Sequence, residues 1–156
     1  MRHGQTEDTS TGGDYLRALT PRGRAEAEAM GQTWKSLVDI RRCVVSGAER
    51  TRQTAEAVQA GAQSSFEIVE RRDLYLGGSE TLCDVLAQEV AATGVTLLVA
   101  HNPGIGGALR RLTGERIAFA PGTAVLIALH LENWSELGPG CGSVRTCWSP
   151  GGRLGG

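Results

Sequence analysis

The amino-acid sequence predicts an α/β protein, a three-layer α/β/α sandwich with a mostly parallel central sheet. Two observations carry this prediction. Short β-branched runs alternate along the chain with longer segments whose apolar residues recur at helical spacing. The polar residues of greatest chemical interest also follow directly after the predicted strands, which is where open α/β sheets place their ligand sites.

The first half of the chain predicts two helices and one strand. Thr20 suits an N-cap and Pro21 suits the first turn of a helix, and the apolar residues that follow predict a helix over 21–38. The β-branched run at 43–46 predicts a short buried strand. Residues 48–60 predict a second helix, so that a strand leads directly into a helix.

The second half repeats this alternation. Ser79 suits the cap of a helix whose apolar face continues to Val90. The run at 95–100 is the clearest strand, because all but one of its residues are apolar and half are β-branched. Pro103 predicts the start of another helix, and 123–131 predicts the last strand. Each predicted strand except the last is therefore followed by a helix.

The length of 156 residues suits a single domain. We expect this domain to span 1–137, and the Gly-rich segment 138–156 to form a loosely ordered tail. In the predicted architecture His3 ends a central strand, although only two residues precede it. The first strand is therefore expected to be truncated, either because an apolar segment belongs ahead of Met1 or because the domain folds with a shortened strand.

Composition narrows the class of protein. The net charge is −1, which gives no electrostatic case for nucleic-acid or membrane-surface binding, and no apolar run is long enough to span a bilayer. The cysteines lack the spacing of a zinc site. Cys43 and Cys83 lie in apolar stretches and are expected in the core, whereas Cys141 and Cys147 could pair. These features predict a reduced, cytoplasmic protein without a bound metal.

The residue of greatest chemical interest is His3, which lies between Arg2 and Gly4. Arg50 follows the strand predicted at 43–46, and His101 follows the strand predicted at 95–100. The carboxyl ends of parallel strands meet at one edge of a sheet, so these side chains can converge. An imidazole beside arginines and a second imidazole suits a tetrahedral dianion, because a phosphoryl group is neutralised by fixed positive charge.

Three segments carry a family resemblance: Arg2-His3-Gly4, Ser46 with Arg50-x-x-Gln53-Thr54-Ala55, and His101-Asn102-Pro103-Gly104. Together they resemble the histidine phosphatase (phosphoglycerate mutase-like) superfamily, and within it the small bacterial phosphohistidine phosphatases of the SixA type. The resemblance implies a phosphoglycerate mutase-like sandwich with its pocket at the strand ends. It also implies a two-step reaction without metal or other cofactor, through a phosphohistidine intermediate.

The resemblance also implies roles for single residues. His3 would attack phosphorus, while Arg2 and Arg50 would bind the phosphoryl oxygens and a protonated His101 would donate a further hydrogen bond. Gly4 would leave room for the phosphate to approach the backbone, and Asn102 would lie in the pocket.

Asp14, Asp73 and Glu80 are candidate general acids, because no inserted segment supplies a clear one. Asp14 could equally only order the loop before the first helix by pairing with Arg17. The chain also departs from the subgroup at Thr6, where a small residue is often found, and at Ala18, where proline is usual.

The sequence leaves the substrate open. The expected partner is a protein carrying phosphohistidine or a phosphorylated small molecule, with neither nucleic acid nor membrane involved. A broad-specificity small-molecule phosphomonoesterase is an alternative within catalysis. A non-catalytic module that binds phosphate or phosphoproteins is an alternative from another class.

Overall fold

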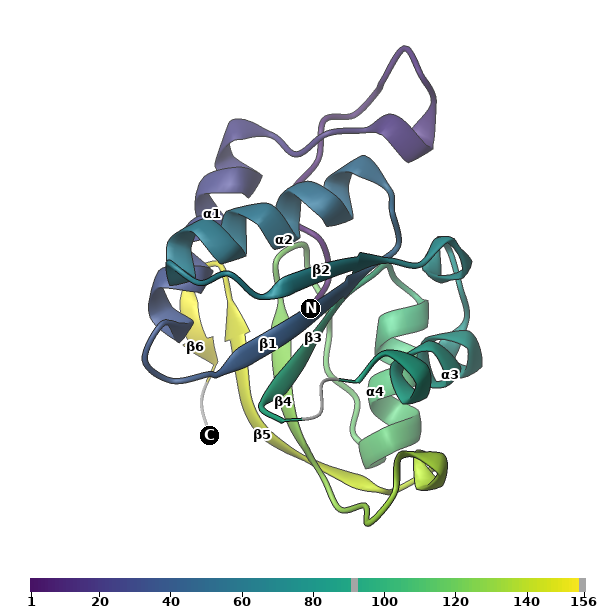
Figure 1. Ribbon diagram of the computed structural model, residues 1–156. Coiled ribbons are helices and arrows are strands. Elements are labelled where there is room, and N and C mark those ends of the chain that lie inside the picture. The colour runs from purple at the N-terminus through teal and green to yellow at the C-terminus, as the bar shows by residue number, and fades with distance from the viewer. Residues whose placement is uncertain (91–92, 155–156) are drawn as a thin grey trace.

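The computed structural model describes residues 1–90 and 93–154. Four α-helices lie on the two faces of the sheet: α1 (Pro21–Trp34), α2 (Glu49–Ala62), α3 (Ser79–Glu89) and α4 (Gly104–Thr113). Single 3-10 turns are η1 (Asp14–Leu16), η2 (Arg72–Leu74) and η3 (Trp134–Glu136). The helices α1 and α2 pack in one core cluster and α3 and α4 in another, on opposite faces of the strands (Figure 1). The predicted three-layer sandwich is therefore confirmed.

The first half of the sheet is parallel. The strand β1 (Ile40–Val45) lies between β2 (Glu67–Glu70) and β3 (Val95–Val99), and both pairings are parallel. The predicted strands at 43–46 and 95–100 are confirmed, although β1 begins three residues earlier than expected. The strand β2 was not predicted, because two glutamates flank its two apolar residues and leave no clear apolar run.

The second half of the sheet is antiparallel. The strand β4 (Ala124–Leu129) pairs with β5 (Gly142–Ser149), which pairs in turn with β6 (Gly152–Leu154). The expectation of a mostly parallel sheet thus holds only for β1 to β3. The strand predicted at 123–131 is confirmed as β4.

The prediction of a loosely ordered tail over 138–156 is wrong for the segment 142–154. The high glycine content of this segment led to the wrong prediction. Gly140 and Gly152 have positive φ and belong to turns, not to a flexible coil. Between them Trp148 is only 5% exposed and meets Trp34 of α1 edge-to-face, with ring centroids 5.5 Å apart. This segment is therefore part of the domain core, and no domain boundary falls at residue 137.

The residues Met1 to His3 join the two halves of the sheet. Arg2 forms an isolated parallel bridge with Ala100, just after β3, and its backbone N–H donates to the Thr123 carbonyl, just before β4, at 2.9 Å. The His3 N–H donates to the Ala100 carbonyl at 3.3 Å. The expected short first strand is thus a single bridge, and beside it an apolar cavity of about 420 Å³ lies between β3 and β4.

The helix predictions are largely confirmed. The Thr20 hydroxyl accepts from the Gly23 N–H at 2.9 Å, as expected of the N-cap of α1. This helix ends at Trp34, four residues before the predicted end, because residues 35–37 form a turn that leads into β1. The cap of α3 is Gly78 rather than Ser79. No helix in the described part of the chain is long and apolar enough to cross a membrane.

Replacing Trp148 with alanine tests the assignment of β5 to the core. We expect the free energy of unfolding to fall by about 3–5 kcal/mol, because the substitution removes a buried indole and leaves a cavity. Chemical denaturation monitored by circular dichroism measures this loss. Arg145→Ala, at an exposed position of the same strand, is the matched control and should change stability by less than about 0.5 kcal/mol. An equally small change for both variants would show that β5 contributes little to the core.

Candidate active site

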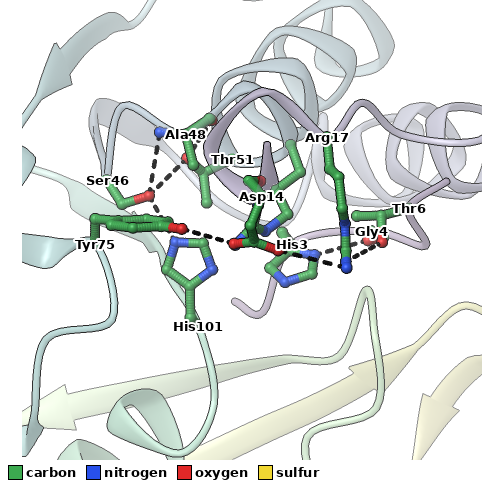
Figure 2. Close-up of polar contacts among 11 residues, drawn as sticks. His3, Gly4, Thr6, Asp14, Arg17, Ser46, Ala48, Thr51, Tyr75 and His101 are labelled. Carbon is green, nitrogen blue, oxygen red and sulfur yellow. Dashed lines mark hydrogen bonds and ion pairs between the residues drawn. The ribbon is translucent and has the colours of Figure 1, made fainter. Parts of the chain in front are cut away.

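The residues of chemical interest meet at the carboxyl ends of the parallel strands. Ser46 follows β1, His101 follows β3, and His3 follows the bridge at Arg2. The imidazole rings of His3 and His101 lie with their centroids 5.2 Å apart (Figure 2). The structure therefore brings together side chains that are almost 100 residues apart, as the order of strands and helices predicts.

His3 is held as a neutral imidazole with a defined tautomer. Its ring is 7% exposed, and Nδ1 lies 2.8 Å from the Gly4 carbonyl oxygen. A carbonyl only accepts hydrogen bonds, so Nδ1 carries the proton and Nε2 keeps its lone pair. Burial above all, together with the nearby charges of Arg50 and Arg2, lowers the pKa of His3 to about 4. The ring is therefore uncharged near neutral pH and has a free nucleophilic nitrogen.

Gly4 packs between α1 and α2. Its N–H donates to the Thr54 hydroxyl at 3.0 Å, which joins it to α2. A Cβ at this position would lie 3.0 Å from the Gly23 carbonyl oxygen of α1. Close approach to α1 is thus one reason for glycine here, and room for a phosphate at Gly4 stays a prediction.

Arg50 is a buried cation held by one acidic residue. It is 3% exposed, and its terminal nitrogens donate to the Asp14 carbonyl oxygen at 2.6 Å and to the Asp14 carboxylate at 2.9 Å. Its Nε is buried without a hydrogen-bond partner among the described residues. A buried donor without a partner is unusual and is consistent with a group that completes its bonds to a ligand.

Arg2, like Arg50, has a buried guanidinium nitrogen without a hydrogen-bond partner among the described residues. Its Nη1 donates to the Phe119 carbonyl oxygen at 2.8 Å, whereas its Nε is buried and unpaired within the described part of the chain. The Asn102 amide also donates to this carbonyl oxygen, at 3.0 Å. Asn102 therefore helps to hold the segment that anchors Arg2, and direct contact of Asn102 with a phosphate stays a prediction.

Asp14 contacts two arginine side chains and a tyrosine hydroxyl group. Besides Arg50 it contacts Arg17, with Nη1 3.4 Å from the carboxylate, and it accepts from the Tyr75 hydroxyl at 2.6 Å. The hydrogen bond from Tyr75 and the bond and charge of Arg50 lower the pKa of Asp14, against a smaller effect of burial. Pairing with Arg17 was one of the two interpretations of Asp14. A carboxyl group with a lowered pKa carries no proton near neutral pH, so this arrangement argues against the general-acid interpretation.

Two residues of the site were not assigned to it from the sequence. Arg17 donates to the Thr6 hydroxyl at 2.7 Å, its Nε is buried without a partner among the residues described, and its charge lowers the pKa of His3. Arg17 lies in the segment before α1, close in sequence to Asp14. From this position we predicted only that it pairs with Asp14 and orders the loop. Tyr75 meets the His101 ring edge-to-face, with centroids 5.6 Å apart. No sequence pattern singles out Tyr75.

His101 differs from the expected protonated donor. It is 4% exposed, and its Nε2 lies 2.7 Å from the Ser46 hydroxyl oxygen. Burial above all, together with the charge of Arg50, lowers the pKa of His101 to about 3. Without a ligand this imidazole is therefore neutral near pH 7, because a second buried cation beside Arg50 is unfavourable.

The described residues include no cluster of three or more side chains of the kind that ligate a metal ion. Cys141 and Cys147 are both free, as are Cys43 and Cys83, so no disulfide joins the cysteines that were considered for pairing. The cluster thus combines neutral imidazoles with arginine guanidinium groups. Such a set of side chains can bind an oxyanion and present a nucleophile to it.

The fold and this cluster define the class of protein: a phosphatase built on the phosphoglycerate mutase-like α/β sandwich. The family model of the histidine phosphatase superfamily (branch 1) matches residues 1–80. The chain therefore belongs to the histidine phosphatase superfamily, and the predicted family is confirmed. No curated protein matches the chain significantly.

Solved structures agree with this assignment. A protein assigned as the phosphohistidine phosphatase SixA of Nakamurella multipartitia superposes with a TM-score of 0.80 at 27% identity, over 96% of this chain and 93% of that one. The protein histidine phosphatase SixA in complex with tungstate gives a TM-score of 0.80 at 26% identity, over 96% and 94%. A protein assigned as SixA of Agrobacterium tumefaciens gives 0.63 at 28% identity, over 74% and 75%.

The two neutral histidines predict a dependence of stability on pH. The pKa values of His3 and His101 are lowered to about 4 and about 3, so below pH 6.5 the unfolded chain binds protons that the folded protein does not. We therefore expect the free energy of unfolding to fall as the pH drops from about 6.5 toward 4. Urea denaturation at several pH values measures the slope. The double variant His3→Gln/His101→Gln should show a shallower slope, and an unchanged slope would contradict burial of neutral imidazoles.

Proposed function

We propose that the protein is a metal-independent phosphatase in which His3 is the nucleophile and the substrate class is phosphohistidine. The observation that carries the proposal is the state of His3. Its Nδ1 proton is bound to the Gly4 carbonyl, its ring is neutral, and its Nε2 lone pair is free. A neutral imidazole is a competent nucleophile near pH 7, whereas an imidazolium is not.

The reaction has two steps. In the first, the Nε2 lone pair of His3 forms a bond to phosphorus while the bond between phosphorus and the leaving atom of the substrate breaks, and that atom takes a proton from solvent. In the second, a water oxygen attacks phosphorus, the bond to Nε2 breaks, and inorganic phosphate leaves. His3 is then regenerated with its Nδ1 proton still bound to Gly4.

Arg2, Arg17 and Arg50 are proposed to bind the phosphoryl oxygens. Each has a buried Nε that lacks a hydrogen-bond partner in the described part of the chain, and the charges of all three lower the pKa of His3. Guanidinium groups fixed before the substrate arrives stabilise charge as it develops on phosphorus without reorganising. Their positions beside His3 support binding of a phosphoryl group rather than of a neutral ligand.

The substrate class rests on two points. Two solved structures that are similar to this chain are described as a phosphohistidine phosphatase and a protein histidine phosphatase, the second in complex with the oxyanion tungstate. The pKa of Asp14 is lowered, so Asp14 is not suited to be the protonated carboxyl group that a poor leaving group needs. A phosphorylated imidazole is a good leaving group and needs less protonation by the enzyme.

The four free cysteines are consistent with a reducing, cytoplasmic compartment.

Replacing His3 with alanine tests the nucleophile. We expect hydrolysis of an aryl phosphate and of a phosphohistidine peptide, both measured in EDTA, to fall by at least about 10³-fold, because no other side chain replaces the lost nitrogen. Trapping a phosphorylated enzyme by rapid acid-free quench should succeed only with wild type. Turnover that survives the substitution would overturn the mechanism. A wild-type protein that binds tungstate but hydrolyses neither substrate would indicate a binding module, and hydrolysis of the aryl phosphate alone would indicate a broad phosphomonoesterase.

Two arginines of the same helix test the phosphoryl contact. Arg50→Ala should lower kcat/KM by about 10²- to 10³-fold and weaken tungstate binding, because a buried donor at the transition state is lost. Arg52→Ala is the matched control. Arg52 pairs with Glu49 and Glu56 and its side chain is 39% exposed, so we expect kcat/KM within about twofold of wild type. Equal effects of the two substitutions would exclude a specific role for Arg50.

A further inference from the structure

Two hydroxyl groups connect His101 to the first turn of α2 (Figure 2). The Thr51 hydroxyl lies 2.8 Å from the Ala48 carbonyl oxygen. A carbonyl only accepts, so the single hydroxyl proton of Thr51 is committed to this bond. The Ser46 hydroxyl lies 3.0 Å from the Thr51 hydroxyl, and of these two groups only Ser46 has a proton left to donate. The direction of the bond between them is therefore fixed.

The same reasoning extends to the imidazole. Ser46 donates its proton to Thr51, so its oxygen accepts from its other neighbours, which are the Ala48 N–H at 3.4 Å and the His101 Nε2 at 2.7 Å. Ser46 and Thr51 are both fully buried, so bulk solvent does not compete for these bonds. His101 consequently carries its proton on Nε2, and its Nδ1 has a lone pair.

We infer that Ser46 and Thr51 are positioning residues that fix the Nε2–H tautomer of His101, so that Nδ1 takes up a proton when a phosphoryl group binds and then donates it to a phosphoryl oxygen. This inference rests on the proposed function of the site. It assigns an orienting role to two hydroxyl groups that need not touch the substrate.

The two imidazoles of the site then have opposite tautomers. His3 has its proton on Nδ1, bound to the Gly4 carbonyl, and a lone pair on Nε2. His101 has its proton on Nε2, bound to Ser46, and a lone pair on Nδ1. His3 must stay unprotonated to attack phosphorus, so the proton that accompanies the dianion belongs on His101. The oxygen of Ser46 stabilises the resulting imidazolium by accepting its Nε2–H.

The charges around His101 decide when this proton is bound. The charged and titratable neighbours on the surrounding elements are Arg2, His3, Asp14, Arg50 and Tyr75. Arg50 and Arg2 oppose a positive charge on His101, and Asp14 favours it. An incoming dianion adds negative charge against the arginines, so the pKa of His101 rises when the ligand binds.

A substitution at Thr51 tests whether the direction of the hydrogen bonds from Ser46 determines the tautomer of His101. Thr51→Val removes the acceptor of the Ser46 proton while keeping a side chain of similar shape. The Ser46 hydroxyl is then free to donate to the His101 Nε2, and the proton of the imidazole moves to Nδ1. Thr51→Ser keeps the hydroxyl group and is the conservative control.

The ring nitrogens of His101 report the tautomer directly. In ¹⁵N-detected NMR of the ligand-free, full-length chain we expect Nε2 to carry the proton in wild type and in Thr51→Ser, and Nδ1 to carry it in Thr51→Val. Protonation of Nδ1 in wild type, or an unchanged Nε2–H in Thr51→Val, would overturn the inference. This measurement needs no turnover, so its failure is distinct from failure of the proposed phosphatase activity.

Kinetics show whether the tautomer matters for the reaction. Thr51→Val should lower kcat by at least about tenfold with a smaller change in KM, as a wrongly oriented histidine proton does in other hydrolases. The basic limb of its kcat–pH profile should move to lower pH, because Ser46 then donates to the imidazole and disfavours the imidazolium. Thr51→Ser should restore both properties. A profile like that of wild type in Thr51→Val would refute the positioning role. If Thr51→Val does not fold, Ser46→Ala and the wild-type spectrum provide the test.

Discussion

The chemistry of the site depends on the burial of two uncharged imidazoles beside fixed guanidinium groups. Burial by itself disfavours charge, so His3 and His101 both lose affinity for protons, and the arginines lower that affinity further. The arginines retain their charge because the guanidinium group hardly deprotonates in proteins. The site therefore separates its two chemical tasks. The imidazoles stay available as bases or nucleophiles, while the arginines supply positive charge that the pH does not remove.

The fold supports this site through backbone contacts of the residues around His3. Arg2 bridges to Ala100 on one side and donates to Thr123 on the other, and His3 donates to the Ala100 carbonyl. These bonds fix the backbone of the proposed nucleophile between the parallel and the antiparallel halves of the sheet. Gly4 then packs against Gly23 of α1, where a Cβ would be in tight contact with a carbonyl oxygen. The placement of His3 thus depends on both sheet halves and on the first helix.

The sequence was most informative where local chemistry and topology agree. His3, Arg50 and His101 could be grouped because each follows a strand, and parallel strands place such residues at one edge. Arg17 and Tyr75 were missed because their place in the site depends on how the loops around η1 and η2 fold together, which no periodicity encodes. The strand β5 was missed for another reason. Its glycines suggested flexibility, whereas the burial of Trp148 against Trp34 outweighs their conformational freedom.

The balance of charge is consistent with the proposed binding and release of a dianion at this site. The guanidinium groups of Arg2, Arg17 and Arg50, less the carboxylate of Asp14, leave two net positive charges while the histidines are neutral. A phosphoryl dianion would balance this charge and so weaken the repulsion that keeps a proton off His101. The proton that His101 is inferred to take up on binding would then donate to a phosphoryl oxygen and stabilise the negative charge there during transfer. When phosphate leaves, the same burial and the same arginines expel that proton, and the site returns to its initial state.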